Sequence, residues 1–269
     1  MTNVIRIEDL RDPRLAVYRQ MRANPVDVSD SGCFVVEGRW CVQRLAQSQH
    51  EILSLLVERG REAVACECVQ GQTPIYSLPG DQVRDLVGFD FHRGMIACGA
   101  RPIIQAFDQL RLGTDRPNFA LAVLGVDQTE NLGSMMRSAA ALGVQDVLIG
   151  PRTADPFARR TVRVSMAAVL HQTLYSLDDP ANQLKLLAEE QGYRTVVTTL
   201  GHAVPLNQFV PDDRPMILVV GNEAEGVSAE VERAATDRVT IPMKLGTDSL
   251  NVAVATAIFL YQLASGVRN

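Results

Sequence analysis

One short apolar run most constrains how this chain can fold: Met216-Ile217-Leu218-Val219-Val220. The run has the length of a strand and shows no alternation of polar and apolar residues, so both faces of that strand must be buried. Such strands occur in parallel sheets that are covered by helices on both sides. We therefore predict an α/β fold, whose ligands bind beyond the carboxyl ends of the strands.

The remaining pattern alternates strands with helices in two halves. Strands are predicted at Phe34–Val36, Ile52–Val57, Ile75–Ser77, Met95–Cys98, Phe119–Leu124, Val147–Ile149, Thr195–Thr198 and Arg238–Ile241, and helices at Arg39–Gln47, Asp81–Val87, Asn131–Gly143, Asn182–Gln191, Ala229–Ala235 and Val252–Leu263. Between the halves, Pro102, Gly113 and Pro117 indicate a connector. We expect a small α/β domain over residues 1–105, a linker over 106–117 and a second domain over 118–269.

Composition narrows the class of function. A net charge of −5 argues against indiscriminate binding to nucleic acid, although it permits a local basic site. Lys185 and Lys244 are the only lysines, and the many arginines suit phosphate recognition, although arginine-rich codon usage explains them more simply. Five scattered cysteines indicate neither a disulfide framework nor a metal site. No membrane span or signal peptide is visible, so we expect a cytoplasmic protein.

The predicted helix at 131–143 carries one long cation among small residues. Gly133 and Arg137 are four residues apart and share one stripe, so Arg137 projects above a patch that has no side chain. A guanidinium in that position could bind a phosphate and stabilise developing negative charge. Asn131 could cap this helix. An ordinary cap followed by a surface arginine is the simpler alternative.

Two later loops follow predicted strands. The loop at 221–228 contains two glycines, but Val227-Ser228 replaces the Lys-Ser/Thr pair of a phosphate-binding loop. This loop is better suited to a neutral or cationic ligand, with Glu223 supplying a carboxylate, and Ser228 could cap the next helix. In the other loop, Pro242 ends the strand, and either Ser249 or Asn251 could cap the last helix.

Together these elements resemble the three sequence motifs of the SpoU-type (TrmH-like) RNA ribose methyltransferases of the SPOUT superfamily. The matching residues are Asn131-x-Gly133-x-x-x-Arg137, then Gly221-x-Glu223-x-x-Gly226, then Ile241-Pro242-Met243 followed by Ser249-Leu250-Asn251-Val252. Arg163-Val164-Ser165 is similar to the family's Arg-x-Ser segment, and Ala167 stands where many members have glycine. Each motif alone is weak, whereas the three in this order are specific.

The resemblance implies a SPOUT domain with a parallel sheet and a deep trefoil knot, preceded by a small substrate-binding α/β domain. It also implies a homodimer with active sites at its interface, S-adenosylmethionine as cofactor and no metal. The implied cofactor-binding residues are Gly221, Ile241 and Leu250, helped by Asn222, Met243 and the turn Thr199-Leu200-Gly201. Arg137 would act on the RNA, and Asn131, Glu223, Ser249 and Asn251 would position Arg137, the RNA or the loops.

The implied reaction is methyl transfer to a ribose 2′-hydroxyl of structured RNA, with ribosomal RNA favoured over transfer RNA. One alternative is a non-catalytic RNA-binding or ribosome-assembly factor with the same fold. A Rossmann dehydrogenase is disfavoured because no Gly-x-Gly-x-x-Gly follows a predicted strand. In the first domain, Arg39, Arg44, Arg93 and Arg101 could contact RNA or lie solvated at the surface, and Trp40 is expected to pack against its own domain.

Overall fold

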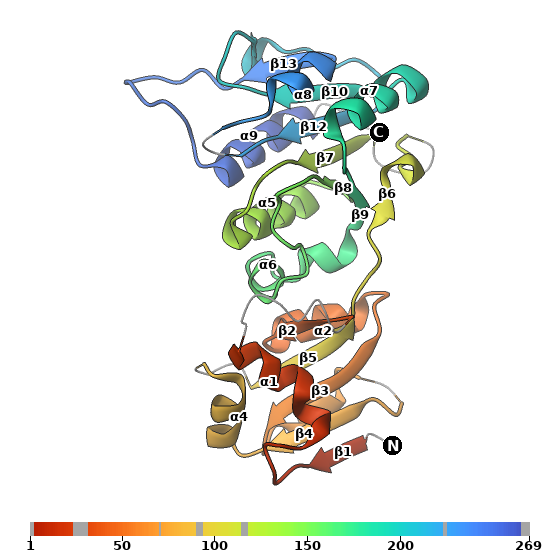
Figure 1. The fold of residues 1–269 in the computed structure, drawn as a ribbon, viewed down its shortest axis with the longest axis vertical. Coiled ribbons are helices and arrows are strands. Elements are labelled where there is room, and N and C mark those ends of the chain that lie inside the picture. The colour runs from red at the N-terminus through yellow and green to blue at the C-terminus, as the bar shows by residue number, and fades with distance from the viewer. Residues whose placement is uncertain are drawn as a thin grey trace. The chain divides into compact units, whose positions relative to one another are not determined.

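A computed structural model describes residues 3–23, 32–69, 71–89, 94–113, 118–222 and 225–264. The chain divides into two compact units (Figure 1). The first contains residues 1–103 and 155–170, and the second contains residues 104–154 and 171–269. Each unit has a sheet of its own.

The first unit is built on a mixed five-stranded sheet with the order β1-β4-β3-β5-β2. Its strands are β1 (Asn3–Arg6), β2 (Cys33–Glu37), β3 (Ile52–Glu58), β4 (Pro74–Leu78) and β5 (Met95–Ala100). Its helices are α1 (Ala16–Ala23), α2 (Arg39–Gln47), α3 (Glu62–Cys66), α4 (Gly80–Val87) and α6 (Arg159–Val164), with the 3-10 turn η1 (Pro13–Leu15). A further 3-10 turn, η4 (Ala168–His171), ends in the first residue of the second unit's later segment. β5 runs antiparallel to both neighbours, whereas β1, β4 and β3 are parallel.

The segment 155–170 packs with the first unit, although the sequence pattern assigns it to the second domain. Charged contacts hold it there, together with the burial of its apolar side chains. The side chain of Glu37 is only 4% exposed, and its carboxylate accepts a hydrogen bond of 3.0 Å from Nη1 of Arg159 on α6. The guanidinium of Arg101 donates two hydrogen bonds to the two carboxylate oxygens of Asp155, at 2.6 and 2.9 Å. A buried carboxylate needs such a partner, and Arg159 supplies it from a distant part of the chain.

The second unit contains an eight-stranded sheet with the order β11-β13-β10-β12-β7-β8-β9-β6, in which the neighbouring strands are parallel. Its strands are β6 (Gln105–Ala106), β7 (Phe119–Val123), β8 (Asp146–Ile149), β9 (Thr173–Ser176), β10 (Arg194–Thr198), β11 (Val204–Pro205), β12 (Met216–Val220) and β13 (Asp237–Thr240). Its helices are α5 (Thr129–Ala141), α7 (Pro180–Gln191), α8 (Ala229–Ala234) and α9 (Val252–Ala264), with the 3-10 turns η3 (Phe107–Gln109) and η5 (Leu206–Gln208). The predicted parallel sheet is confirmed.

Helices cover this sheet and bury its central strands. Residues of α7 and α8 share one apolar core with alternate residues of those strands, whereas α5 and α9 lie side by side (Figure 1). All five residues of β12 are buried, as the run at 216–220 predicts. The described part of the chain has no helix that is long and apolar enough to cross a membrane.

Part of the predicted linker belongs to the second unit. β6 pairs with β9 at the sheet edge, and Leu110 and Leu112 are buried. The backbone N–H of Leu112 donates to the hydroxyl of Tyr193 at 3.0 Å. Buried apolar side chains therefore attach this segment to the sheet. The proline and glycine residues alone indicated a connector and did not predict this packing. Residues 114–117 lie outside the described residues.

The first residues of three helices show which of the predicted N-caps are present. One predicted cap is wrong, and two others are confirmed. α5 begins at Thr129 after Gln128, so Asn131 lies within its first turn and is not the cap. Ser228 does cap α8, because its Oγ accepts from the N–H of Val231 at 3.4 Å. Of the two candidates at α9, Asn251 is the cap, since its Oδ1 accepts from the N–H groups of the residues two and three positions later.

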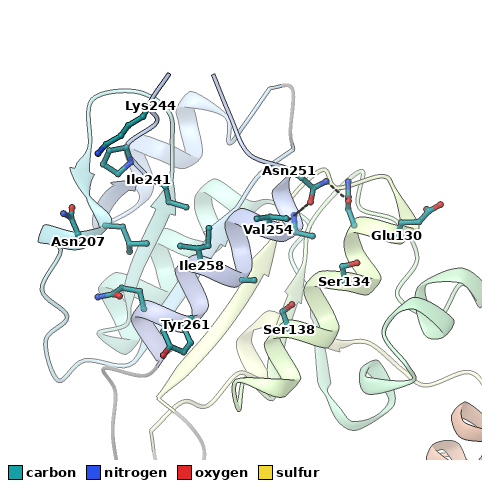
Figure 2. Close-up of a pocket in the computed structure, with 16 residues that line it drawn as sticks. Glu130, Ser134, Ser138, Asn207, Ile241, Lys244, Asn251, Val254, Ile258 and Tyr261 are labelled. Atoms are coloured by element: carbon teal, nitrogen blue, oxygen red, sulfur yellow. Dashed lines mark hydrogen bonds between the residues drawn. The ribbon is translucent and has the colours of Figure 1, made fainter. Parts of the chain in front are cut away.

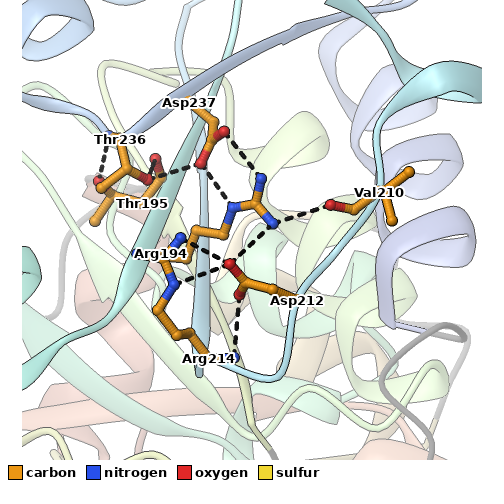
Figure 3. A network of polar contacts seen from close by, with 7 residues as sticks. All are labelled: Arg194, Thr195, Val210, Asp212, Arg214, Thr236 and Asp237. Carbon is orange, nitrogen blue, oxygen red and sulfur yellow. Dashed lines mark hydrogen bonds and ion pairs between the residues drawn. The ribbon is translucent and has the colours of Figure 1, made fainter.

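The first residue of β10 anchors an ion-pair network (Figure 3). Two nitrogens of Arg194 bind the two carboxylate oxygens of Asp237, at 2.7 and 3.0 Å, and a third donates to the carbonyl of Val210. Asp212 approaches the same guanidinium at 3.5 Å. The hydrogen bond from Arg194 lowers the pKa of Asp237, and the same bond raises the pKa of the guanidinium. This network joins β10, β13 and the loop before β12.

Ala167 has an unusual backbone conformation. Its φ angle is 61°, and that of Met166 is 54°, so both residues are left-handed. Glycine adopts this region without a steric penalty, which is a physical reason for glycine at this position in many members of the resembling family. The methyl group of Ala167 is completely buried, and this burial offsets part of the steric cost of the left-handed conformation.

Candidate cofactor and catalytic site

A cavity of about 230 Å³ opens beyond the carboxyl ends of β10, β12 and β13. All eight predicted cofactor-binding residues line it: Thr199, Leu200, Gly201, Gly221, Asn222, Ile241, Met243 and Leu250. They come from three loops that are distant in sequence and follow neighbouring strands. The structure therefore brings these residues together at the edge where ligands of parallel sheets bind.

Gly221 forms the tightest point of this wall. A Cβ atom at this position would lie 2.2 Å from the carbonyl oxygen of Gly226 and 2.6 Å from the nitrogen of Val227. Both neighbours are backbone atoms, which cannot rotate away. Glycine is therefore required at 221 by the close approach of two chain segments.

Asn222 fixes the loop after β12. Its backbone N–H donates to the carbonyl of Gly226 at 3.2 Å, and the N–H of Gly226 donates back at 2.9 Å. Its side-chain Nδ2 donates to the carbonyl of Gly125, in the loop after β7, at 2.8 Å. The amide of Asn222 therefore links two strand-end loops, so this residue shapes the cavity as well as lining it.

The cavity combines an apolar floor with a partly acidic rim. Val220, Val252 and Phe259 are buried and form the floor. Glu225 and Glu232 line the rim, and Glu225 also forms an exposed ion pair of 3.5 Å with Arg152. Carboxylates in this position favour a ligand that carries positive charge, although solvent screening keeps the effect small.

Sequence reasoning missed several residues that line this cavity. They are Thr198, Val220, Glu225, Gly226, Val227, Glu232, Val252, Ala255 and Phe259. Gly226 belongs to one of the three motifs and could have been selected from it. Phe259 could not, because α9 is strongly apolar and its pattern does not distinguish a cavity wall from the core.

A second, larger hollow lies along α5 and α9 (Figure 2). It has a volume of about 910 Å³, and Asn131, Ser134 and Ser138 of α5 line one side. Within it, Nδ2 of Asn251 donates to Oδ1 of Asn131 at a distance of 3.0 Å. Ile241 lines both this hollow and the smaller cavity, so the two spaces adjoin.

The predicted catalytic residues do not meet in one cavity. Ser249 lines the smaller cavity, whereas Asn131 and Asn251 line the larger hollow. Arg137 is exposed on α5 and lines neither. Glu223 lies outside the described residues. Within the described part of the chain, no cluster of three or more His, Cys, Asp or Glu residues could hold a metal ion.

The chain is similar to known proteins over most of its length. The SpoU rRNA methylase family matches residues 118–261. An uncharacterized tRNA/rRNA methyltransferase of Mycobacterium tuberculosis is 35% identical over 94% of this chain and 89% of that protein. The 23S rRNA (guanosine(2553)-2′-O)-methyltransferase RlmP of Bacillus subtilis is 34% identical over 96% of this chain and 98% of its own. An AdoMet-bound rRNA methyltransferase from Sinorhizobium meliloti has a TM-score of 0.83 to this fold, at 21% identity over 99% of both chains.

The chain belongs to the SpoU rRNA methylase family. It is an S-adenosylmethionine-dependent RNA methyltransferase, which confirms the predicted class of enzyme and its cofactor. The α/β fold with a parallel sheet agrees with the solved structure of the Sinorhizobium meliloti protein.

Proposed function

We propose that this enzyme transfers a methyl group to a ribose 2′-hydroxyl of ribosomal RNA. One observation carries the proposal: the eight residues expected to hold the cofactor line a single cavity, although they come from three separate loops. The similarity to RlmP, whose name specifies 2′-O-methylation of 23S rRNA, supports both the acceptor atom and the class of RNA.

The smaller cavity suits S-adenosylmethionine. Its apolar floor accommodates a flat ring, its loop backbones offer hydrogen-bonding groups, and its rim carboxylates complement a cation. Gly221, Ile241 and Leu250 would hold the cofactor through backbone groups, helped by Asn222, Met243 and residues 199–201. The bound cofactor supplies an electrophilic methyl group on a sulfonium centre.

Arg137 would assist the acceptor hydroxyl. A ribose 2′-hydroxyl is a poor nucleophile near neutral pH, so its negative charge must be stabilised as the oxygen attacks. A guanidinium stays protonated and is therefore a poor general base. We assign Arg137 to electrostatic stabilisation of the developing alkoxide, with a phosphate oxygen of the RNA accepting the proton. Asn131, Glu223, Ser249 and Asn251 would position these groups.

A second copy of the chain would complete this site. Arg137 lines neither cavity of its own chain, so a single copy does not place it at the cofactor wall. On α9, Val254, Ile258 and Tyr261 are 50, 41 and 67% exposed and form one apolar stripe (Figure 2). We propose that this stripe packs against a partner subunit in a homodimer.

The proposal also includes the trefoil knot in the second domain and a role of the first domain in binding RNA.

Methyl transfer from labelled S-adenosylmethionine to ribosomal RNA tests this function. RNA from cells that lack the protein is the substrate, because its target nucleotide is then unmodified. Label should enter ribosomal RNA and not transfer RNA. A protein that binds both cofactor and RNA but transfers no label would support the non-catalytic alternative.

A further inference from the structure

The single tryptophan of the chain lies at the surface of the first unit. Trp40 is 70% exposed, so the expectation that it packs against its own domain is wrong. It stands in the first turn of α2, whose buried side is formed by Cys41, Val42 and Leu45. Such an indole leaves a large aromatic surface in water, where another flat ring could cover it.

Trp40 heads a continuous stripe along α2. Gln43, Arg44 and Gln47 follow it at i+3, i+4 and i+7, and these spacings place all four side chains on one side of the helix. Trp40, Arg44 and Gln47 are exposed, and Gln43 is partly exposed. The stripe therefore combines one aromatic plane with a cation and two amides.

Two arginines lie on or beside this stripe. Arg39 lies next to Trp40 in sequence and forms a long, exposed ion pair of 3.9 Å with Glu67. A guanidinium nitrogen of Arg44 donates to the carbonyl of Met166, in the loop after α6. The other N–H groups of that guanidinium can still bind a phosphate.

α6 adds further cations to the same unit. Arg160 and Arg163 are exposed on this helix. The carboxylate near Arg163 is that of Glu37, at 3.7 Å, and it is buried and already bonded to Arg159. The first unit therefore presents exposed arginines on both α2 and α6, while the net charge of the whole chain is −5. These exposed arginines suit a local contact with a polyanion.

We propose that Trp40 stacks on an unpaired base of the RNA substrate, with Arg44 and Arg39 on the adjacent phosphates. This inference rests on the proposed function, because it assigns the RNA-binding surface of the first unit. Aromatic planes flanked by arginines are a common way to bind single-stranded RNA. The stripe has one apolar group among polar ones, whereas a protein partner would require a wider apolar centre.

The fluorescence of Trp40 tests the inference directly, since no other tryptophan contributes. The probes are a short single-stranded RNA of mixed sequence and the same RNA annealed to its complement. The single strand should quench the indole emission to saturation, and the duplex should quench it much less. Equal responses to both RNAs, or no response to either, would overturn base stacking.

Substitutions separate the aromatic ring from the charge. Trp40→Ala should weaken binding of the single-stranded RNA about tenfold, and Trp40→Phe should retain most of the affinity because its ring still stacks. Binding is followed by the polarisation of a dye on the RNA, so the variants remain measurable without tryptophan. Unchanged affinity of Trp40→Ala would contradict the inference, and so would an indole emission that depends on protein concentration, since a second copy would then cover Trp40.

A kinetic measurement distinguishes this inference from the proposed function. In methyl transfer to ribosomal RNA, Trp40→Ala should raise KM for RNA about tenfold and change kcat little. If the wild-type protein transfers no methyl group, the proposed function fails. If the wild type is active and Trp40→Ala has the same KM, only the role of Trp40 fails.

Discussion

Asn251 and Asn131 are joined by a hydrogen bond of 3.0 Å, although 120 positions separate them in sequence. The same Asn251 side chain caps α9 through its Oδ1, at 3.0 and 3.3 Å from two backbone nitrogens. One amide therefore holds the start of α9 against α5, the helix that carries Arg137. The motif residue acts as a cap and as a link between two motifs at once.

The two roles of Asn251 can be separated by substitution. Asn251→Asp keeps an oxygen for the cap but places a carboxylate opposite the oxygen of Asn131, so methyl transfer should fall while the cap survives. Asn251→Ala removes both roles and should cost about 1 kcal/mol of stability. Thermal unfolding and methyl transfer are measured on both variants. Equal losses of stability in the two variants would argue against the cap.

Gly221→Ala should abolish cofactor binding. The added Cβ would lie 2.2 Å from a backbone oxygen, so the loop must move to accept it. Gly201→Ala is the milder variant on the same wall, because its Cβ would meet only the Thr199 side chain at 3.5 Å. Titration calorimetry with S-adenosylmethionine should show loss of binding for the first variant and at most a small change for the second. Normal binding by Gly221→Ala would remove this loop from the cofactor site.

Ile258→Glu should convert the proposed homodimer to a monomer. The substitution places a charge in the centre of the exposed apolar stripe on α9, where burial against a partner would leave it unpaired. Light scattering measures the mass. The monomer should lose methyl transfer, because in the proposed dimer two chains complete each site. Glu190→Arg, an exposed position on α7, is the control and should stay dimeric. A wild-type protein that is monomeric and active would exclude the interface.

Asp237→Asn should lower the free energy of unfolding at neutral pH and make that free energy depend less on pH in the acidic range. The pKa of Asp237 is lowered by Arg194 in the folded state, so its carboxylate contributes stability above its unfolded pKa of about 4. That contribution is lost as the pH falls through the pKa that Asp237 has in the folded protein. At neutral pH, loss of the charged bond should cost about 2 kcal/mol. Thermal unfolding between neutral and strongly acidic pH compares the variant with the exposed control Asp213→Asn, which should follow the wild type.

Arg137→Ala should abolish methyl transfer and leave cofactor binding unchanged. The residue is exposed, so its truncation should alter the free energy of unfolding by less than about 0.5 kcal/mol. Arg137→Lys keeps the charge but loses the planar fork and should recover only a small part of the activity. Activity and cofactor affinity are measured on both variants. An active Arg137→Ala enzyme would remove this residue from the mechanism.

The pattern of the sequence predicted strands β7, β8, β10, β12 and β13 of the second unit, because apolar runs of this length are typical of buried parallel strands. It missed the short strands β6, β9 and β11. The resemblance to the family's three motifs, rather than the pattern alone, grouped eight of the residues that line the smaller cavity. It did not reveal that residues 155–170 pack with the first unit, because that packing rests on long-range contacts, among them the ion pair between the buried Glu37 and Arg159.

Trp40 and Asn131 show the limits of local reasoning. Burial of an aromatic residue is an average tendency, and the exposed side of α2 can be identified only when the helix is packed. The cap of α5 was misplaced because the helix starts two residues earlier than its motif. Boundaries of this kind depend on the preceding loop, whose conformation is set by tertiary contacts.

The identity of the methylated nucleoside tests the central claim most directly. Ribosomal RNA from cells lacking the protein is incubated with the enzyme and labelled S-adenosylmethionine, digested to nucleosides and analysed by mass spectrometry. We predict that the label appears in a 2′-O-methylated nucleoside with the wild-type protein and is absent with Arg137→Ala. Label on a base, or no label in any RNA, would contradict the account.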